Sequence, residues 1–132
     1  MDSERYQVDT DFLVWAVSSS GKERRRLLRI ASSASDLRIS AVAWYEFARG
    51  PRTAEQLAVA RSLFGDEGVI ALSEHLAALA AEVFRALGSP RRRAADIAIG
   101  TTAAASGATL LTRNAREFEG IPGLRVEGSV VE

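Results

Sequence analysis

The sequence Val8-Asp9-Thr10-Asp11-Phe12-Leu13-Val14-Trp15 decides how the rest of the chain is interpreted. Residues 5–8 have the character of a short strand, and residues 12–17 have that of a short helix. Asp9 and Asp11 therefore stand where the strand passes into the helix. In an open α/β sheet, ligands and catalytic groups collect just past the carboxyl ends of the strands. We therefore expect Asp9 to mark a functional site.

The composition is that of an ordinary globular protein. The chain has 132 residues, 47% of them hydrophobic and 26% charged, with a formal net charge of zero. This balance argues against bulk attraction to nucleic acid, although it is compatible with a local basic face beside an acidic site. The first residues do not resemble a signal peptide, and the longest apolar tract contains Asp96, so we expect no membrane partner and a cytoplasmic location.

Cysteine, histidine and lysine are too scarce for several kinds of chemistry. The absence of cysteine excludes disulfides, thiol nucleophiles and Cys-ligated zinc. The single histidine, His75, lies off the apolar stripe of a helical pattern, so we expect it at the surface rather than in a catalytic triad. Lys22 is the sole lysine, which leaves little room for lysine-dependent chemistry.

Strand patterns alternate with helical patterns along the whole chain. We expect strands at residues 5–8, 37–39, 69–72, 108–112 and 124–126. Such alternation predicts the α/β class, with a mainly parallel sheet covered by helices on both faces.

Several predicted helices begin with a capping signal. Ser40 and Ser73 stand at N-cap positions, and the segments 20–23, 53–56 and 114–117 fit the capping-box pattern. The last of these boxes offers a purely structural explanation for its glutamate. Whether that glutamate has a structural or a functional role is therefore open at this point.

Three carboxylates occupy positions where a charge is locally unfavourable. Asp9 ends an apolar strand, Glu46 lies on the apolar stripe of its helix, and Asp96 begins a helix of small and apolar residues. Asp9 and Asp96 could each serve a helix terminus, whereas Glu46 has no capping explanation. Isolated buried carboxylates have raised pKa values or destabilise the fold. A shared Mg²⁺ or Mn²⁺, which prefers oxygen ligands, would resolve this conflict.

Five motifs, taken in order, resemble the PIN domain family. They are Val8–Leu13, Ile39–Ser40 with Glu46–Gly50, Asp96–Ala103, Leu111–Phe118 and Ile121–Val126. More narrowly, the set is similar to the VapC-type toxins of bacterial toxin–antitoxin pairs. The resemblance implies a three-layer α/β/α PIN-like domain over residues 1–132, with a mainly parallel central sheet of about four to five strands.

The resemblance also implies a metal-dependent endoribonuclease, the toxin of a type II system, with Mg²⁺ or Mn²⁺ as cofactor. The matching catalytic and metal-binding acids are Asp9, Glu46, Asp96 and Glu117. The matching supporting residues are Thr10, Asp11, Thr112 and Asn114. The family usually has Asn where Asp11 stands, so Asp11 either joins the acids or turns away toward its helix.

The implied partners are an RNA substrate, a small antitoxin protein and a second copy of the chain in a homodimer. Arginines that flank the motifs in sequence are candidates for contacts with the RNA backbone. They are Arg91, Arg92, Arg93, Arg113 and Arg116.

Three other functions fit parts of the pattern. Asp9-x-Asp11 after a strand suggests a haloacid-dehalogenase-like phosphatase or, less well, a receiver-like domain, but both classes expect a late lysine and Lys22 comes too early. A non-catalytic PIN-like binding module is the alternative from a different class. Its weakness is that such a module has no need for buried carboxylates.

Overall fold

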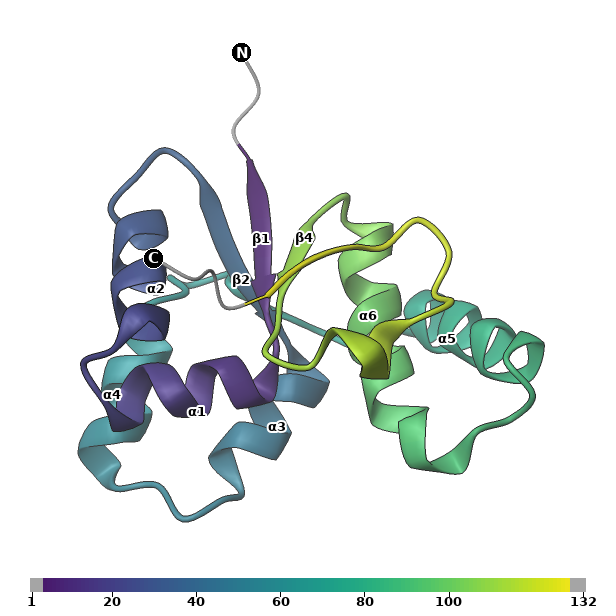
Figure 1. Ribbon diagram of the computed structural model, residues 1–132, viewed down its shortest axis with the longest axis horizontal. Helices are drawn as coiled ribbons and strands as arrows, with labels where there is room; N and C mark the ends of the chain where they lie inside the picture. The colour runs from purple at the N-terminus through teal and green to yellow at the C-terminus, as the bar shows by residue number, and fades with distance from the viewer. Residues whose placement is uncertain (1–3, 129–132) are drawn as a thin grey trace.

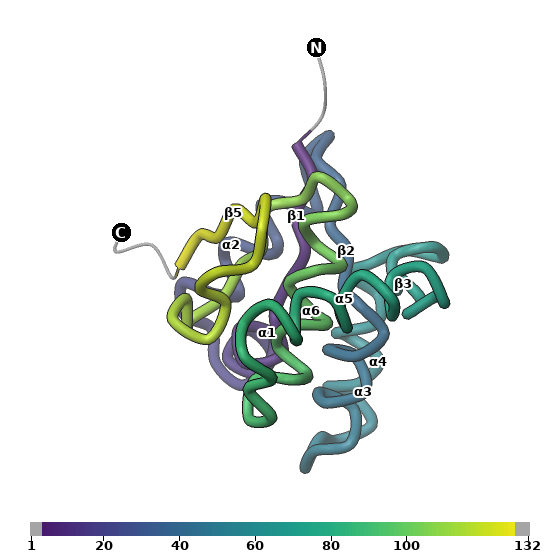
Figure 2. The backbone as a smooth tube through the Cα atoms, turned by 90° about the vertical axis from the view of Figure 1, so that its right-hand side faces the viewer, coloured from purple at the N-terminus to yellow at the C-terminus, as the bar shows by residue number. Residues whose placement is uncertain are grey.

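A five-stranded parallel sheet forms the centre of the protein in the computed structural model, which describes residues 4–128. The strand order is β3-β2-β1-β4-β5, and all of the pairings are parallel. The strands are β1 (Arg5–Val8), β2 (Asp36–Ser40), β3 (Val69–Ile70), β4 (Thr109–Leu111) and β5 (Arg125–Glu127). Figure 2 shows β3 and β5 at opposite edges. The predicted α/β class and parallel sheet are confirmed.

Helices cover both faces of this sheet. Figure 1 shows α1, α2 and α4 on one side of the strands and α5 and α6 on the other. The helices are α1 (Thr10–Ser18), α2 (Lys22–Ala31), α3 (Ala41–Ala48), α4 (Ala54–Ser62), α5 (Glu74–Ala86) and α6 (Ala94–Ala105), with 3₁₀ turns η1 (Arg91–Arg93) and η2 (Ala115–Phe118). Within residues 4–128, none of these helices has the length and apolar character needed to cross a membrane.

Local capping chemistry explains where most of the helices begin. The Ser40 hydroxyl accepts a hydrogen bond from the Ala43 amide at 3.1 Å, and Ser73 caps α5 in the same way. Thr53 and Gln56 form the predicted capping box, with both bonds at 3.0 Å. Each bond satisfies an amide that the first helical turn leaves unpaired.

Two of the predicted capping boxes are wrong. Gly21, not Ser20, is the N-cap of α2 and provides no side-chain bond; Glu23 instead approaches Arg113, with 3.6 Å between Oε2 and Nε. Asn114 provides no side-chain cap to η2, and its own amide donates to the Thr112 hydroxyl at 3.0 Å. Because that amide is already satisfied, the structural explanation for Glu117 fails.

Strand β3 is shorter and more exposed than the sequence predicts. It ends at Ile70, whereas the pattern predicts a buried strand as far as Leu72, which is exposed. The physical reason is the pairing with β2, in which Ile70 is opposite Ser40. Since β2 ends at Ser40, the residues after Ile70 have no parallel neighbour to extend the ladder.

The hydrophobic core fixes the sheet between the helical layers. Val8, Ile39 and Leu110 from three strands are fully buried, as are Phe12 of α1 and Ile97 of α6. Burying an apolar side chain of this size contributes about 1.5–3 kcal/mol relative to leaving it exposed. The strand ends and the first turns of α1 and α6 are therefore held on a rigid frame.

Gly100 lets the chain after η2 lie directly against α6. A Cβ atom at this position would be 2.5 Å from Cδ1 of Ile121, and 3.2 Å from both Cδ2 of Leu124 and Cδ1 of Phe118. An added side chain would require at least the Ile121 side chain to move. The absence of a side chain therefore lets Phe118, Ile121 and Leu124 pack directly against α6.

Candidate active site

A pocket of ≈ 270 Å³ lies where β1, α3, α6 and η2 meet, past the carboxyl end of β1. Side chains from four separate stretches of the sequence line it: Asp9, Thr10, Asp11, Val14, Glu46, Arg49, Asp96, Asn114, Glu117 and Phe118. All of the predicted acids are among them. Thr112 alone of the predicted supporting residues is not in this lining; it is fully buried behind the pocket.

Asp9 links the strand end to the first helix. Its Oδ1 accepts from the Thr10 amide at 2.8 Å and caps α1, while its Oδ2 accepts from the Thr112 hydroxyl at 2.9 Å. The cap explains why α1 begins at Thr10 rather than at Phe12. Burial raises the pKa of Asp9 to about 6 against these bonds, and the negative charges of Glu46 and Asp11 add to the rise.

Asp96 lies half-buried in the first turn of α6. Burial raises its pKa to about 7, with further contributions from the negative charges of Asp9, Glu46 and Glu117, while Arg93 opposes the shift. These carboxylates therefore interact electrostatically within one pocket. Keeping both Asp9 and Asp96 ionised at neutral pH is unfavourable for the folded protein.

Two threonines hold the acids in place. The Thr10 hydroxyl donates to Oε1 of Glu46 at 3.0 Å, which joins α1 to α3. Thr112 donates to Asp9 and accepts from the Asn114 amide, so β1 is tied to the loop before η2. Thr10 and Thr112 therefore contact the acids through their hydroxyl groups, whereas Asn114 is joined to Thr112 through its main-chain amide.

Asp11 lies at the pocket and is paired with an arginine from another segment. It lines the pocket, and its Oδ2 accepts from Nη1 of Arg113 at 3.3 Å. Of the two alternatives left open by the sequence, the structure supports the first, because the Asp11 carboxylate is in the pocket wall and the N-cap of α1 is Asp9.

None of the arginines proposed from sequence lines the pocket. Arg93 donates to the main-chain oxygens of Glu117 and Glu119 at 3.1 and 2.6 Å. Arg113 lies between Asp11 and Glu23, with Cζ 4.1 Å from the centroid of the Trp15 ring. The side chains of Arg91, Arg92 and Arg116 are exposed and lie outside the lining.

Arg49 lines the pocket and was missed by the sequence reasoning. A signal for it was present, because Arg49 follows Glu46 by one helical turn and residues three apart share a helix face. Arg49 is far in sequence from Asp9 and Asp96, and only the fold brings the end of α3 beside them. Its place in the pocket could therefore not be predicted from sequence proximity.

The donor chemistry of the pocket fits a hard divalent cation. All the acidic side chains offer oxygen atoms, which Mg²⁺ and Mn²⁺ prefer. A cation would also relieve the repulsion that raises the pKa of Asp96. Among residues 4–128, no group of three acidic or histidine side chains is already arranged to hold an ion.

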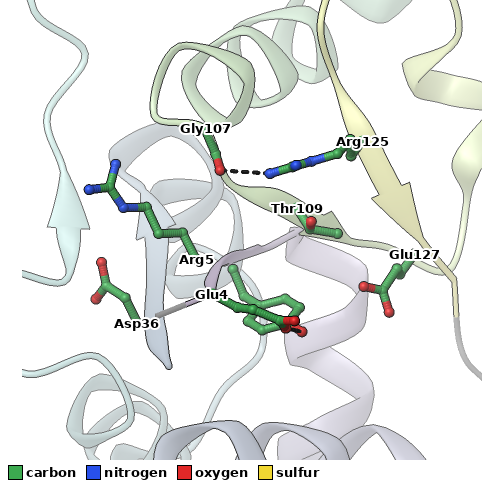
Figure 3. Close-up of a pocket in the computed structure, with 8 residues that line it drawn as sticks. Glu4, Arg5, Asp36, Gly107, Thr109, Arg125 and Glu127 are labelled. Carbon is green, nitrogen blue, oxygen red and sulfur yellow. Dashed lines mark hydrogen bonds between the residues drawn. The ribbon is translucent and has the colours of Figure 1, made fainter. Parts of the chain in front are cut away.

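A larger hollow of ≈ 1030 Å³ lies around the amino ends of the strands (Figure 3). Its lining mixes both charges, and its arginines are engaged. Arg125 donates to the Gly107 oxygen at 2.8 Å, the bond drawn in Figure 3, and Arg5 donates to the Ser106 oxygen at 3.0 Å. These contacts satisfy carbonyls at the end of α6, which indicates a structural region.

An open parallel α/β sheet with an acidic pocket at its carboxyl edge defines the class of the protein. The model of the PIN domain family matches residues 6–124. The chain therefore belongs to the PIN domain family. No curated protein matches the sequence.

Several solved structures share this fold. VapBC2 from Rickettsia felis, bound to a promoter DNA fragment, has a TM-score of 0.73 at 22% identity, covering 94% of this chain and 98% of that chain. A toxin–antitoxin complex from Klebsiella pneumoniae has a TM-score of 0.71 at 24% identity, covering 96% and 99%. DNA-bound VapBC from Salmonella typhimurium has a TM-score of 0.70 at 22% identity, with the same coverage. At these identities the likeness concerns the fold.

Proposed function

We propose that the protein is a metal-dependent endoribonuclease and the toxin of a type II toxin–antitoxin pair. The observation that carries the proposal is the convergence of Asp9, Glu46, Asp96 and Glu117 on one pocket. Membership of the PIN domain family supports a nuclease, and the toxin–antitoxin complexes of similar fold support the narrower role. We extend the proposal to a single PIN-like domain over residues 1–132.

The acids would supply the ligands and the threonines would orient them. Asp9 and Asp96, with Glu46 and Glu117, would hold Mg²⁺ or Mn²⁺. When bound, such a cation lowers the pKa of a water molecule and offsets the negative charge of the phosphodiester. The Thr112 hydroxyl donates to one oxygen of Asp9, and the Thr10 hydroxyl donates to one oxygen of Glu46. The remaining lone pairs of these carboxylates therefore stay available to the pocket.

The competing functions find less support in the structure. A haloacid-dehalogenase-like phosphatase or a receiver-like domain would need a lysine beside the acids, and Lys22 is not in the pocket lining. A non-catalytic binding module would gain nothing from carboxylates whose pKa values are raised by burial and mutual repulsion. We therefore favour the nuclease.

The partners follow from the same proposal. The solved toxin–antitoxin complexes support a small antitoxin protein as a partner of this chain. A homodimer and a cytoplasmic location complete the proposal, and both are expectations from the family resemblance and the composition.

Cleavage of total cellular RNA by the purified chain tests the proposal. With Mn²⁺ or Mg²⁺ we expect cutting that EDTA abolishes and that Asp96→Asn reduces by at least about 100-fold, since one charged ligand is lost. Asp66→Asn is the matched control, because Asp66 is an exposed acid outside the pocket. Intact RNA in the presence of folded, metal-bound wild-type protein would contradict the proposal.

A further inference from the structure

Arg49 is the basic residue among the described side chains that line the acid pocket. It follows α3 directly as its C-cap, and its side chain is exposed. Within residues 4–128 its guanidinium makes no hydrogen bond or ion pair, and its contact is with the ring of Tyr45, 5.5 Å from Cζ to the centroid. Its charge is therefore available to a ligand at the pocket.

Two other arginines near the pocket, Arg113 and Arg93, are already engaged in contacts. Arg113 faces the carboxylates of Asp11 and Glu23, and Arg93 donates to two main-chain oxygens. Moving either of them to a phosphate would break contacts that hold the fold. A phosphodiester that approaches a cluster of carboxylates needs a compensating cation, and a guanidinium matches phosphate oxygens in geometry.

Tyr45 adds a second kind of contact at the same place. Its side chain is 64% exposed, the largest exposed fraction among the big hydrophobic side chains described. It precedes Arg49 by four residues, so both lie on one face of α3 beside Glu46. Exposed aromatic rings beside a cationic site are how proteins bind unpaired bases, which stack on the ring face.

We infer that Arg49 and Tyr45 form a contact site for single-stranded RNA at the α3 rim of the acid pocket. Arg49 binds a backbone phosphate next to the bond that is cut, and Tyr45 stacks on an adjacent unpaired base. Both are positioning residues for substrate rather than ligands of the cation. The inference rests on the proposed nuclease function and specifies its substrate as unpaired RNA.

Binding measurements separate this contact from cleavage. All variants are made in the Asp96→Asn protein without divalent metal, and a fluorescent unstructured RNA of about twelve nucleotides is titrated at several salt concentrations. The substitutions are Arg49→Gln, Arg49→Lys, Tyr45→Leu and Tyr45→Phe. Arg85→Gln on the exposed face of α5 is the matched control, since it removes one charge away from the pocket. Thermal unfolding verifies that each variant is folded.

The two residues are expected to give different signatures. Arg49→Gln should weaken binding about tenfold and reduce the slope of log affinity against log salt by about 0.7, the value for one phosphate contact on a single strand. Tyr45→Leu should weaken binding roughly five- to tenfold without changing that slope, because stacking releases no counterion. Tyr45→Phe and Arg85→Gln should bind as the parent does, and Arg49→Lys should keep the salt slope.

A duplex of the same sequence provides the second measurement. Tyr45→Leu should leave its binding unchanged, because stacked and paired bases are not available to the ring. If Arg49→Gln and Tyr45→Leu bind single-stranded RNA as tightly as the parent, the inference is wrong while metal-dependent cutting by the wild type still supports the nuclease. If the parent binds no RNA and the wild type cuts none, both proposals fail.

Discussion

At the amino ends of the strands, Arg5 and Arg125 donate to main-chain oxygens at the end of α6, whereas at the carboxyl ends several acids share one pocket with few compensating partners. Two of the acids that line the hollow at these amino ends are also paired, Glu127 with Arg26 at 2.8 Å and Asp36 with Arg38 at 2.9 Å. Charge is therefore matched at one end of the sheet and unmatched at the other.

The two regions differ in how their charged side chains affect stability. Those at the amino ends of the strands stabilise the fold, whereas the acids at the carboxyl ends destabilise it. The amino-edge arginines satisfy carbonyls that the last turn of α6 leaves open. Burial, together with the negative charges of neighbouring acids, raises the pKa values of Asp9 and Asp96, which lowers the stability of the folded protein at neutral pH. Unfavourable groups of this kind are retained where an activity depends on them.

The largest effect should come from removing an acid at the carboxyl edge. The pKa of Asp96 rises from 3.8 to about 7 on folding, so the folded protein holds this proton more tightly than the unfolded chain. Stability is therefore greatest below about pH 4 for this group and declines as the pH rises through 7. Asp96→Asn should raise the free energy of unfolding at pH 8 by about 2 kcal/mol, a figure reduced for the solvent exposure of a half-buried group.

Urea unfolding in EDTA at pH 5 and pH 8 measures this effect. The increase in the free energy of unfolding caused by Asp96→Asn should be smaller at pH 5. Saturating Mn²⁺ should make the wild type the more stable protein at pH 8, because the ion binds its folded state. A variant that is less stable than the wild type at pH 8 without metal would show that the acids are not in conflict.

A smaller and opposite effect is expected at the amino edge. Arg125→Met removes the bond to the Gly107 oxygen and leaves a carbonyl at the end of α6 without its charged donor. We expect a loss of about 1 kcal/mol in the free energy of unfolding, with little dependence on pH between 5 and 8. RNA cleavage at saturating metal should be unchanged, and a loss of activity without a loss of stability would give this edge a functional role.

The smallest effect concerns the partly exposed ion pair between Arg26 and Glu127, beside the same hollow. Glu127→Gln removes the negative charge that pairs with Arg26. The Arg26 side chain is 19% exposed and the Glu127 side chain is 40% exposed. Because solvent screens such a pair, we expect a loss of about 0.5 kcal/mol that disappears in 1 M salt. Unfolding at low and high ionic strength measures it, and a loss that persists in salt would mean that the pair contributes through packing.

Local patterns predicted most of the elements because the forces that set them act over a few residues. Ser40, Thr53 and Ser73 cap their helices as their sequence positions indicate. The sequence predicts too long a strand for β3, because the length of this strand depends on where its neighbour β2 ends. The order of the strands is likewise a tertiary property, and the sequence predicts only that they are mainly parallel.

The acids of the pocket were predictable, but their surroundings were not. Glu46 stood out because a carboxylate on an apolar stripe needs an explanation, and the structure pairs it with Thr10. Glu117 was ambiguous until the Asn114 amide proved to be bonded to Thr112. Sequence proximity to the motifs predicted Arg113, and not Arg49, near the substrate. In the fold Arg49 lines the pocket, whereas Arg113 lies beside Trp15.

Gly100 acts as a spacer for the acid pocket although it touches no ligand. It lies one helical turn beyond Asp96, and a Cβ atom there would be 3.2 Å from Cδ1 of Phe118, the neighbour of Glu117. The space at this position therefore lets the residue next to one acid pack against the helix that carries another. A side chain at position 100 would have to be accommodated by these neighbours, so the position is restricted even though it contributes no charge.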